Sequence, residues 1–324
     1  MSCGEQQLPS ASTELARKGI NGGALSTDGQ FAVIGSIFDG GSLWRIVDGE
    51  RVYKWNHSRA DDERIIISAD IDNNNVRALT TDASTIVLWD MKTGVASRFW
   101  ASPAEILDSK LTTGGQYALL GLANHSAVMF DAVKGGITRT FNHTGRVLSV
   151  DISDDNSLAI TGSEDHTATI WQLSDGKRLF TVQHDEDVQM VKLSRDGRYA
   201  LTAAKYDRVE LWNVTKQTSL GSINLKKEHI KRGLRITAAA FSPNGRYLLL
   251  GYPNRNVELR ELESLALIDQ WTLPKRNQWQ PTAAAVIDVA FDRNTQRYWS
   301  MSSDGFVHLL ESSLTPNTNK NALN

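Results

Sequence analysis

The chain has 324 residues, of which 40% are hydrophobic and 22% are charged, and its formal net charge is −2. This composition is typical of a globular protein with a sizeable core, and the absence of a basic excess argues against a nucleic-acid binder. The single cysteine, Cys3, excludes an intrachain disulfide and a cysteine zinc site. No apolar run reaches the length of a transmembrane helix.

Seven similar units follow one another after a short segment, Ala11 to Arg17, that belongs to none of them. Each unit has a strand with a marker residue near its end, and the marker recurs at intervals of roughly 40 to 50 residues. The marker positions in chain order are Trp44, Trp89, Phe130, Trp171, Trp212, Arg260 and Leu310. Repeats of this length cannot bury an apolar face alone, so we expect the units to pack against one another.

Each marker strand is preceded by a hairpin and followed by a further turn and strand. Segments such as LSTDGQFAVIG and LSRDGRYALTA join a turn to an apolar strand, and their Asp-Gly pairs favour the positive φ angles of tight hairpins. A turn such as LSDG and a strand such as KRLFTV complete the unit. The sequence therefore predicts four strands per unit and no helix of useful length.

The period and the strand pattern resemble those of the WD-repeat family, and the resemblance covers nearly the whole chain. The residues that carry it are Trp44, Trp89-Asp90, Asp165, Trp171, Trp212, His143 and His184. The resemblance implies an all-β fold, a seven-bladed β-propeller of four-stranded blades. Units three, six and seven are degenerate copies, because Phe130, Arg260 and Leu310 replace the tryptophan.

The last unit supplies only three strands, VIDVAF, RYWSMSS and FVHLLES. An open ring would expose strand edges that are prone to aggregation. We therefore expect Ala11 to Arg17 to pair with the last blade as its outer strand and to close the ring. The predicted organisation is an N-terminal tether over residues 1–10, a single propeller over 11–312 and a polar tail over 313–324.

One group of residues has two interpretations. His143, Ser163 and Asp165 could form a hydrolytic triad, but the segment GSED lacks the strained turn and oxyanion hole that a catalytic serine needs. In WD-repeat proteins, residues at such positions form a hydrogen-bonded tether inside the blade, which here includes Trp171. We favour the tether, and no catalytic residue is predicted.

Two metal sites are weighed and set aside. The segment DIDNNN begins like a calcium loop at Asp70 and Asp72, but Asn75 and Thr81 stand where glycine and glutamate are required. Histidines at the gaps between units could form a metal ring only if all pointed to the axis, and such residues are more often hydrogen-bonded. These histidines are His57, His143, His184 and His229. Neither a metal nor a cofactor is predicted.

A partner-binding surface is predicted from three long connections between units, which contain HSRADDE, KKEHIKRGLR and PKRNQWQP. Two of them are basic, and one of these two contains a tryptophan. A basic surface with an aromatic side chain suits an acidic or aromatic peptide. The alternative is a solvated loop whose tryptophan folds back on the blade. The candidate residues are Lys231, Arg232, Arg235, Arg276 and Trp279.

The resemblance implies further contact positions on the central top face, at Phe38, Glu164 and Tyr206. Four charged positions just before the units' first strands are expected near the mouth of the central channel. Their signs alternate, so neighbouring blades are expected to pair these charges. The four are Glu105, Arg146, Asp187 and Arg235.

The predicted function is a non-catalytic platform that binds a protein or peptide partner on its top face, as a monomer in isolation. The alternative is a propeller enzyme, or a cofactor or ligand binder, that uses the central channel. The start MSCGEQQLPSAS resembles the mature terminus of a bacterial lipoprotein. This resemblance implies a lipid on Cys3 that anchors the propeller at a membrane facing the periplasm. The alternative location is the cytoplasm.

Overall fold

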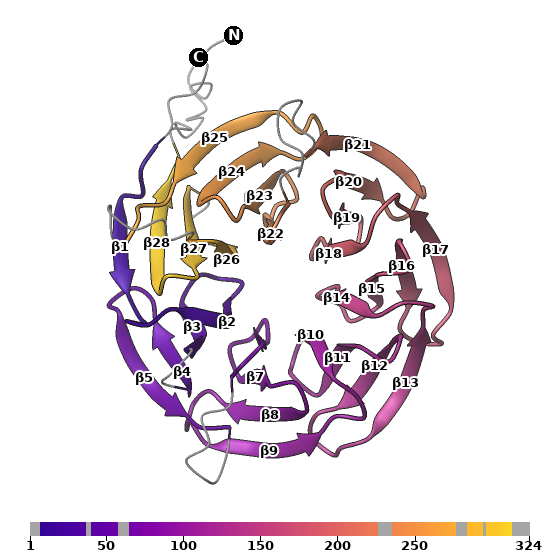
Figure 1. The fold of residues 1–324 in the computed structure, drawn as a ribbon, viewed down its shortest axis with the longest axis horizontal. Helices are drawn as coiled ribbons and strands as arrows, with labels where there is room; N and C mark the ends of the chain where they lie inside the picture. Colours follow the sequence, from indigo (N-terminus) through magenta and orange to yellow (C-terminus); the bar gives the residue numbers. More distant parts are fainter. Residues whose placement is uncertain are drawn as a thin grey trace, which may run out of the picture.

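The computed structural model describes residues 7–36, 40–57, 65–225, 235–276, 284–293 and 296–312. These residues form seven sheets of four strands each, arranged as blades around a central axis (Figure 1). No helix occurs in these ranges. The predicted all-β, seven-bladed propeller is therefore confirmed.

The first three blades follow the chain without interruption. Blade one contains β2 (Ile20–Leu25), β3 (Phe31–Ser36), β4 (Gly40–Arg45) and β5 (Glu50–Trp55). Blade two contains β6 (Ser68–Ile71), β7 (Arg77–Thr81), β8 (Thr85–Asp90) and β9 (Ala96–Ala101). Blade three contains β10 (Ile106–Leu111), β11 (Tyr117–Leu122), β12 (Ser126–Asp131) and β13 (Ile137–Asn142). In each blade the strands run antiparallel from the axis to the rim.

The next three blades repeat this order. Blade four contains β14 (Val147–Ile152), β15 (Leu158–Ser163), β16 (Thr167–Gln172) and β17 (Arg178–Gln183). Blade five contains β18 (Val188–Leu193), β19 (Tyr199–Ala204), β20 (Arg208–Asn213) and β21 (Thr218–Asn224). Blade six contains β22 (Ala238–Phe241), β23 (Tyr247–Gly251), β24 (Asn256–Glu261) and β25 (Leu267–Thr272).

Blade seven is built from both ends of the chain. Its strands are β26 (Val286–Phe291), β27 (Arg297–Ser302), β28 (Phe306–Glu311) and, as the outermost, β1 (Ala11–Glu14). β1 lies antiparallel to β28, with Ala11 opposite Leu309 and Glu14 opposite Phe306. The predicted ring closure is therefore confirmed for the residues of β1.

The N-terminal segment reaches further than the predicted tether allows. Gln7 forms a parallel bridge with Trp271 at the rim of blade six, and its side chain donates to Asp269 at 2.9 Å. The amide of Ser10 donates to the carbonyl of Leu309 in blade seven. Residues 7–10 therefore contact two blades, whereas residues 1–6 and 313–324 lie outside the described ranges.

The middle strands of a blade are buried on both sides because neighbouring blades cover them. In β16 the four central residues are buried, whereas the outermost strand β17 alternates toward solvent. The close approach of blades also explains Gly162. A Cβ atom at this position would lie 2.8 Å from Cγ1 of Val188 in the next blade, too close for any other residue.

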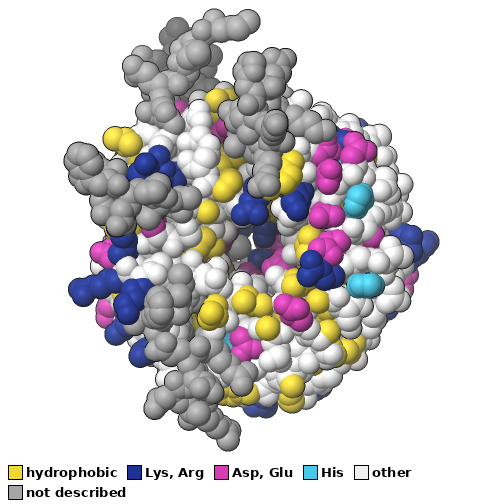
Figure 2. All heavy atoms as spheres, viewed as in Figure 1, with side chains coloured by type: hydrophobic (Ala, Val, Ile, Leu, Met, Phe, Trp, Pro, Cys, Tyr) yellow, Lys and Arg dark blue, Asp and Glu magenta, His cyan; other side chains and the backbone are white. Residues whose placement is uncertain are grey.

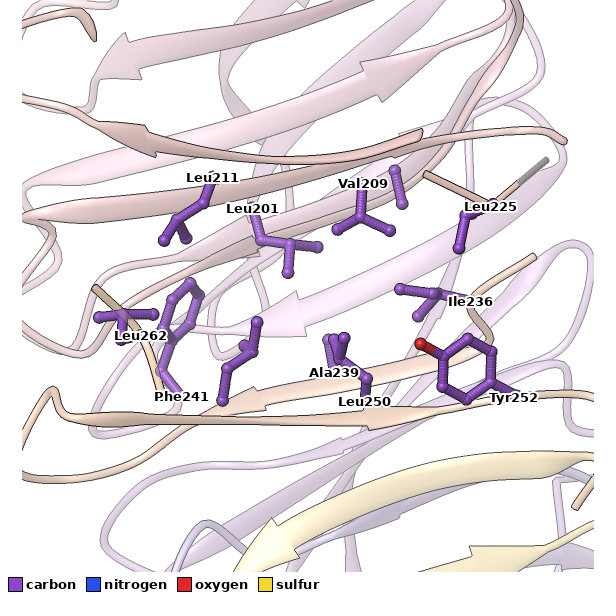
Figure 3. Packing of buried hydrophobic residues seen from close by; sticks show 12 residues of the cluster. Leu201, Val209, Leu211, Leu225, Ile236, Ala239, Phe241, Leu250, Tyr252 and Leu262 are labelled. Atoms are coloured by element: carbon purple, nitrogen blue, oxygen red, sulfur yellow. The ribbon is translucent and has the colours of Figure 1, made fainter. Parts of the chain in front are cut away.

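The hydrophobic core is divided into layers between blades. Figure 3 shows one layer, in which Leu201 and Leu211 of blade five face Phe241 and Leu250 of blade six. The stacking of apolar faces from different units explains why a single unit would not be stable alone.

Candidate functional site

The two faces of the ring carry different connections. The top face carries the links between blades and the turns between the second and third strands of each blade; the bottom face carries the other turns. Figure 2 looks onto the top face, where hydrophobic side chains surround the central opening and charged side chains lie beside them.

The tether of blade four is a chain of three side-chain hydrogen bonds. Trp171 Nε1 donates to Thr161 Oγ1 at 2.8 Å, and Thr161 Oγ1 lies 2.7 Å from His143 Nε2. His143 Nδ1 lies 2.8 Å from Asp165 Oδ2. An Nδ1–H tautomer satisfies every group, since the imidazole then donates to the carboxylate and accepts from the threonine. The network joins the top turn to the third strand.

Thr161 is the residue that sequence reasoning missed, since Ser163 was expected to supply the hydroxyl of the tether. The Ser163 hydroxyl instead accepts a hydrogen bond from the backbone amide of Asp165 at 3.1 Å, and Ser163 is fully buried. Side chains two residues apart share one face of a strand, so Thr161 and Ser163 are neighbours there, and Thr161 is the nearer of the two to Ala159, which lies opposite Trp171. A hydroxyl ten residues before the marker tryptophan recurs as Thr202 before Trp212, which was the available signal.

The geometry does not support a hydrolytic triad at these residues. No hydrogen bond joins His143 to Ser163, and the imidazole is used by Thr161 and Asp165. Burial alone would raise the pKa of Asp165, but hydrogen bonds from Thr167, the amide of Thr144 and His143 lower this pKa below its usual value. Asp165 is thus an ionised acceptor that orders the turn.

Blade two contains a close copy of this network. Trp89 Nε1 donates to Thr80 Oγ1 at 2.7 Å, and Thr80 Oγ1 lies 2.6 Å from His57 Nε2. Asp82 lies 3.6 Å from the other ring nitrogen. The repetition of the network in two separate blades supports its structural role.

Blade five contains an incomplete copy. His184 Nε2 lies 2.9 Å from Thr202 Oγ1, but Tyr206 stands at the position of Asp165, and Asp207 receives a hydrogen bond from Arg208. Burial, with the charge of Arg208 adding to it, lowers the pKa of His184 to about 4. Blade five therefore lacks the carboxylate that orders the top turn of blade four.

Glu164 and Tyr206 both lie on top-face turns, as expected. Arg146 donates two hydrogen bonds to Glu164, at 2.8 and 2.6 Å, and this pairing lowers the pKa of the carboxyl. Tyr206 has a φ of 56° and lies beside Lys205, whose ammonium is 5.7 Å from its ring centroid. Similar left-handed turn residues, His125 and His166, precede it in blades three and four.

The expected alternation of charge between blades is present around Arg146, whose pKa is raised by its hydrogen bond to Glu164 and also by the charges of Glu105 and Asp187 in the two adjoining blades. Glu105, Arg146, Asp187 and Arg235 are not among the residues that line the channel. Arg146 pairs with Glu164 of its own blade rather than with a neighbouring blade. The four charged residues come just before the first strands, whereas the residues that line the cavity begin at the bulge, or its equivalent, in each first strand.

The residues at the mouth come from the bulge, or its equivalent, in each first strand. We call them the mouth ring: Asn21, Ile67, Leu107, Leu148, Gln189, Thr237 and Ile287. Four of the seven are long aliphatic side chains, and all four are half-buried. Sequence reasoning missed this ring, because a bulge interrupts the two-residue alternation, and the period then does not say which way the extra residue faces.

Below the mouth ring, the channel encloses a cavity of about 360 Å³ whose wall is charged on one side. Blades two to five supply Asp70, Lys110, Asp151 and Lys192 at one level. The corresponding residues of the remaining blades are alanines: Ala24, Ala240 and Ala290. Asp70 pairs with Lys110 at 2.8 Å, so it serves the channel wall and not a calcium loop.

Carboxylates on the channel wall also join consecutive blades. Asp70 accepts a hydrogen bond from the amide of Leu111, and Asp151 accepts one from the amide of Leu193.

Within the described ranges, no group of three or more His, Cys, Asp or Glu side chains could hold a metal ion. The described part of the chain has no helix long and apolar enough to cross a membrane.

The tether and the four-stranded units have a counterpart among known families. The family model described as "WD domain, G-beta repeat" matches residues 135–172, from the outermost strand of blade three to the third strand of blade four. The protein is a WD-repeat β-propeller. A search of curated proteins found no match to the chain.

In this WD-repeat propeller, Arg276 has contacts that sequence reasoning did not foresee. Its guanidinium donates to the carbonyls of Ala16, Arg17 and Asp304, and it pairs with Glu14 at 2.9 Å. These contacts hold the segment after β1 against blade seven. Arg276 was expected to contact a partner, but its guanidinium nitrogens are engaged within the chain.

Arg235 is exposed at the start of blade six, on the top face. The remaining residues predicted to contact a partner or a lipid lie outside the described ranges. They are Cys3, Phe38, Lys231, Arg232 and Trp279. Their roles stay predictions.

Proposed function

We propose that this WD-repeat propeller is a non-catalytic platform that binds a protein or peptide partner on its top face. The family match and the fold support the coarse role, since propellers of this family commonly act as interaction scaffolds. The rigid ring presents turns from several blades on one surface, which suits recognition by loops on a fixed scaffold.

The observation that carries this proposal is the set of side chains presented by the top-face turns. On the top face, turns of consecutive blades present His125, His166 and Tyr206 in left-handed backbone conformations. Aromatic and imidazole side chains are frequent at interaction surfaces because they bury apolar area and retain a polar group. Around the axis, the mouth ring adds aliphatic side chains to the same surface.

Partner capture from a lysate of the source organism tests the proposal. The top-face variant is Tyr206→Ala with Arg235→Ala, and the matched bottom-face control is Arg246→Ala, an exposed arginine stacked on Tyr247. We expect a protein retained by the wild type and the control, identified by mass spectrometry, to be depleted at least fivefold with the top-face variant. Loss of capture with the bottom-face control alone would contradict the proposal.

A further inference from the structure

The channel mouth combines an apolar entrance with carboxylates directly below it. In the mouth ring, Ile67, Leu107, Leu148 and Ile287 are half-buried and line the cavity. One residue further along the first strands, Asp108 of blade three and Asp288 of blade seven also line it. A group that enters from the top face therefore meets aliphatic side chains first and carboxylates next.

These two carboxylates differ from the other three that line the cavity, of which Asp154 lies 4.0 Å from Arg195. Asp70 pairs with Lys110 at 2.8 Å, and Asp151 lies 3.9 Å from Lys192. Among the residues that the structure describes, Asp108 and Asp288 have no ion-pair partner within 4.0 Å. A carboxylate removed from water without a cation is costly, which favours a site that a cation completes.

Backbone contacts fix both carboxylates in place while leaving acceptor capacity. Asp108 accepts hydrogen bonds from the amides of Ser109 and Val150 and, at 3.3 Å, from the hydroxyl of Ser68, and Asp288 accepts them from the amides of Val289 and Leu25. Each carboxylate oxygen can accept two hydrogen bonds. Burial raises the pKa of both carboxyls, against the opposing charge of Lys192, as expected for acids that lack a close cation.

The shape of the cavity suits a long and narrow group. The small residues Ala24, Ala240 and Ala290 leave room on the side of the wall opposite the paired charges. At the bottom end, Arg195 of blade five donates to the carbonyl of Thr27 in blade one at 2.7 Å, so its side chain crosses the channel. Entry is therefore from the top face.

We propose that the channel mouth binds a long basic side chain, lysine or arginine, of the partner held on the top face. Its methylene chain packs against the aliphatic members of the mouth ring, and its cation hydrogen-bonds to Asp108 or to Asp288. This inference rests on the proposed function and gives the partner a basic anchor at the axis. Lysine and arginine have the required apolar stem and charged end.

Methyl NMR with a small probe tests the inference without the partner. The probe is n-butylguanidinium, the matched neutral control is n-butylurea, and the signals are the isoleucine methyls of Ile67 and Ile287. We expect n-butylguanidinium to shift these methyls saturably and to bind at least tenfold more tightly than n-butylurea. Equal affinity for the two probes would overturn the inference, because the carboxylates would then contribute nothing.

Variants locate the cation. Asp108→Asn and Asp288→Asn, singly and together, keep the size of the side chain, and each is expected to weaken n-butylguanidinium binding several-fold. The control is Asp131→Asn, a buried carboxylate that caps the amides of Val133 and Lys134 outside the channel. Unchanged binding by folded Asn variants would also overturn the inference. Neither result depends on partner capture, so failure here leaves the proposed function standing.

Discussion

At the scale of single residues, the hydroxyl of Thr161 joins two nitrogen atoms, His143 Nε2 and Trp171 Nε1, that would otherwise have no partner in this network. Trp171 is 6% exposed and Thr161 is fully buried, so their polar atoms cannot turn to water. The sequence indicated the histidine, aspartate and tryptophan of this network, because these types are rare enough to stand out. The pattern alone does not distinguish the hydroxyl of Thr161 from that of Ser163, since both side chains lie on one face of β15.

Replacement of the two hydroxyls separates their roles. Thr161→Val removes one acceptor and one donor and leaves His143 Nε2 and Trp171 Nε1 unpaired, which costs about 2–4 kcal/mol of unfolding free energy. Ser163→Ala removes one contact to a backbone amide and costs about 1 kcal/mol. Urea unfolding measures both values. A larger loss for Ser163→Ala would show that the tether is assigned to the wrong hydroxyl.

Histidine burial predicts a loss of stability on acidification. Burial lowers the pKa of His308 to about 4, and this histidine bonds Ser12 of β1 through Nδ1 at 2.7 Å. The unfolded chain binds the proton near pH 6.5, so stability falls as the pH drops from 6.5 toward 4. For His308 this loss amounts to about 3 kcal/mol.

The variant His308→Asn isolates this contribution. Its unfolding free energy at pH 7 is expected to be lower than that of the wild type, but its decline between pH 6.5 and pH 4 should be smaller by about 3 kcal/mol. Urea unfolding at several pH values gives both quantities. An identical pH dependence in the two proteins would mean that His308 is protonated in the folded state.

At the scale of elements, the ring is held closed by one short strand and by the contacts that follow it. β1 has four residues, and the amides of Leu15 and Ala16 donate to the carbonyl of Gly305 beyond it. The missing fourth strand of the last unit predicted this pairing. The contribution of Arg276 could not be predicted, because its contacts depend on how a connection between blades runs in space.

Arg276→Ala is expected to loosen this closure. The loss of its bonds to the carbonyls of Ala16 and Arg17 should cost about 1–2 kcal/mol, because the side chain is partly exposed. Amide hydrogen exchange at Leu15 and Ala16 should therefore accelerate roughly five- to thirtyfold.

The matched control for this variant is Lys275→Ala, since Lys275 is the exposed neighbour of Arg276. Exchange at Leu15 and Ala16 should remain at the wild-type rate in the control. If Arg276→Ala also left it unchanged, the segment after β1 would be held by its backbone bonds to Gly305 alone.

At the scale of the whole molecule, the architecture followed from repetition, whereas the channel did not. The marker residues and turn pairs predicted seven units of four strands, because each unit repeats the same local chemistry. The channel mouth depends on a bulge in the first strand of a blade, such as that between Ile106 and Asp108, which shifts the residues that face the axis. A bulge breaks the two-residue alternation of a strand, so the period alone could not assign the residue at the bulge to the axis.

The central claim is that the partner binds the top face, and hydrogen exchange of the captured complex tests it most directly. We predict slower exchange, relative to the free protein, in the top-face turns at residues 123–125, 164–166 and 205–208. The bottom-face turns at residues 113–116, 154–157 and 195–198 should exchange at the same rate in both states. Protection confined to the bottom-face turns would contradict the account.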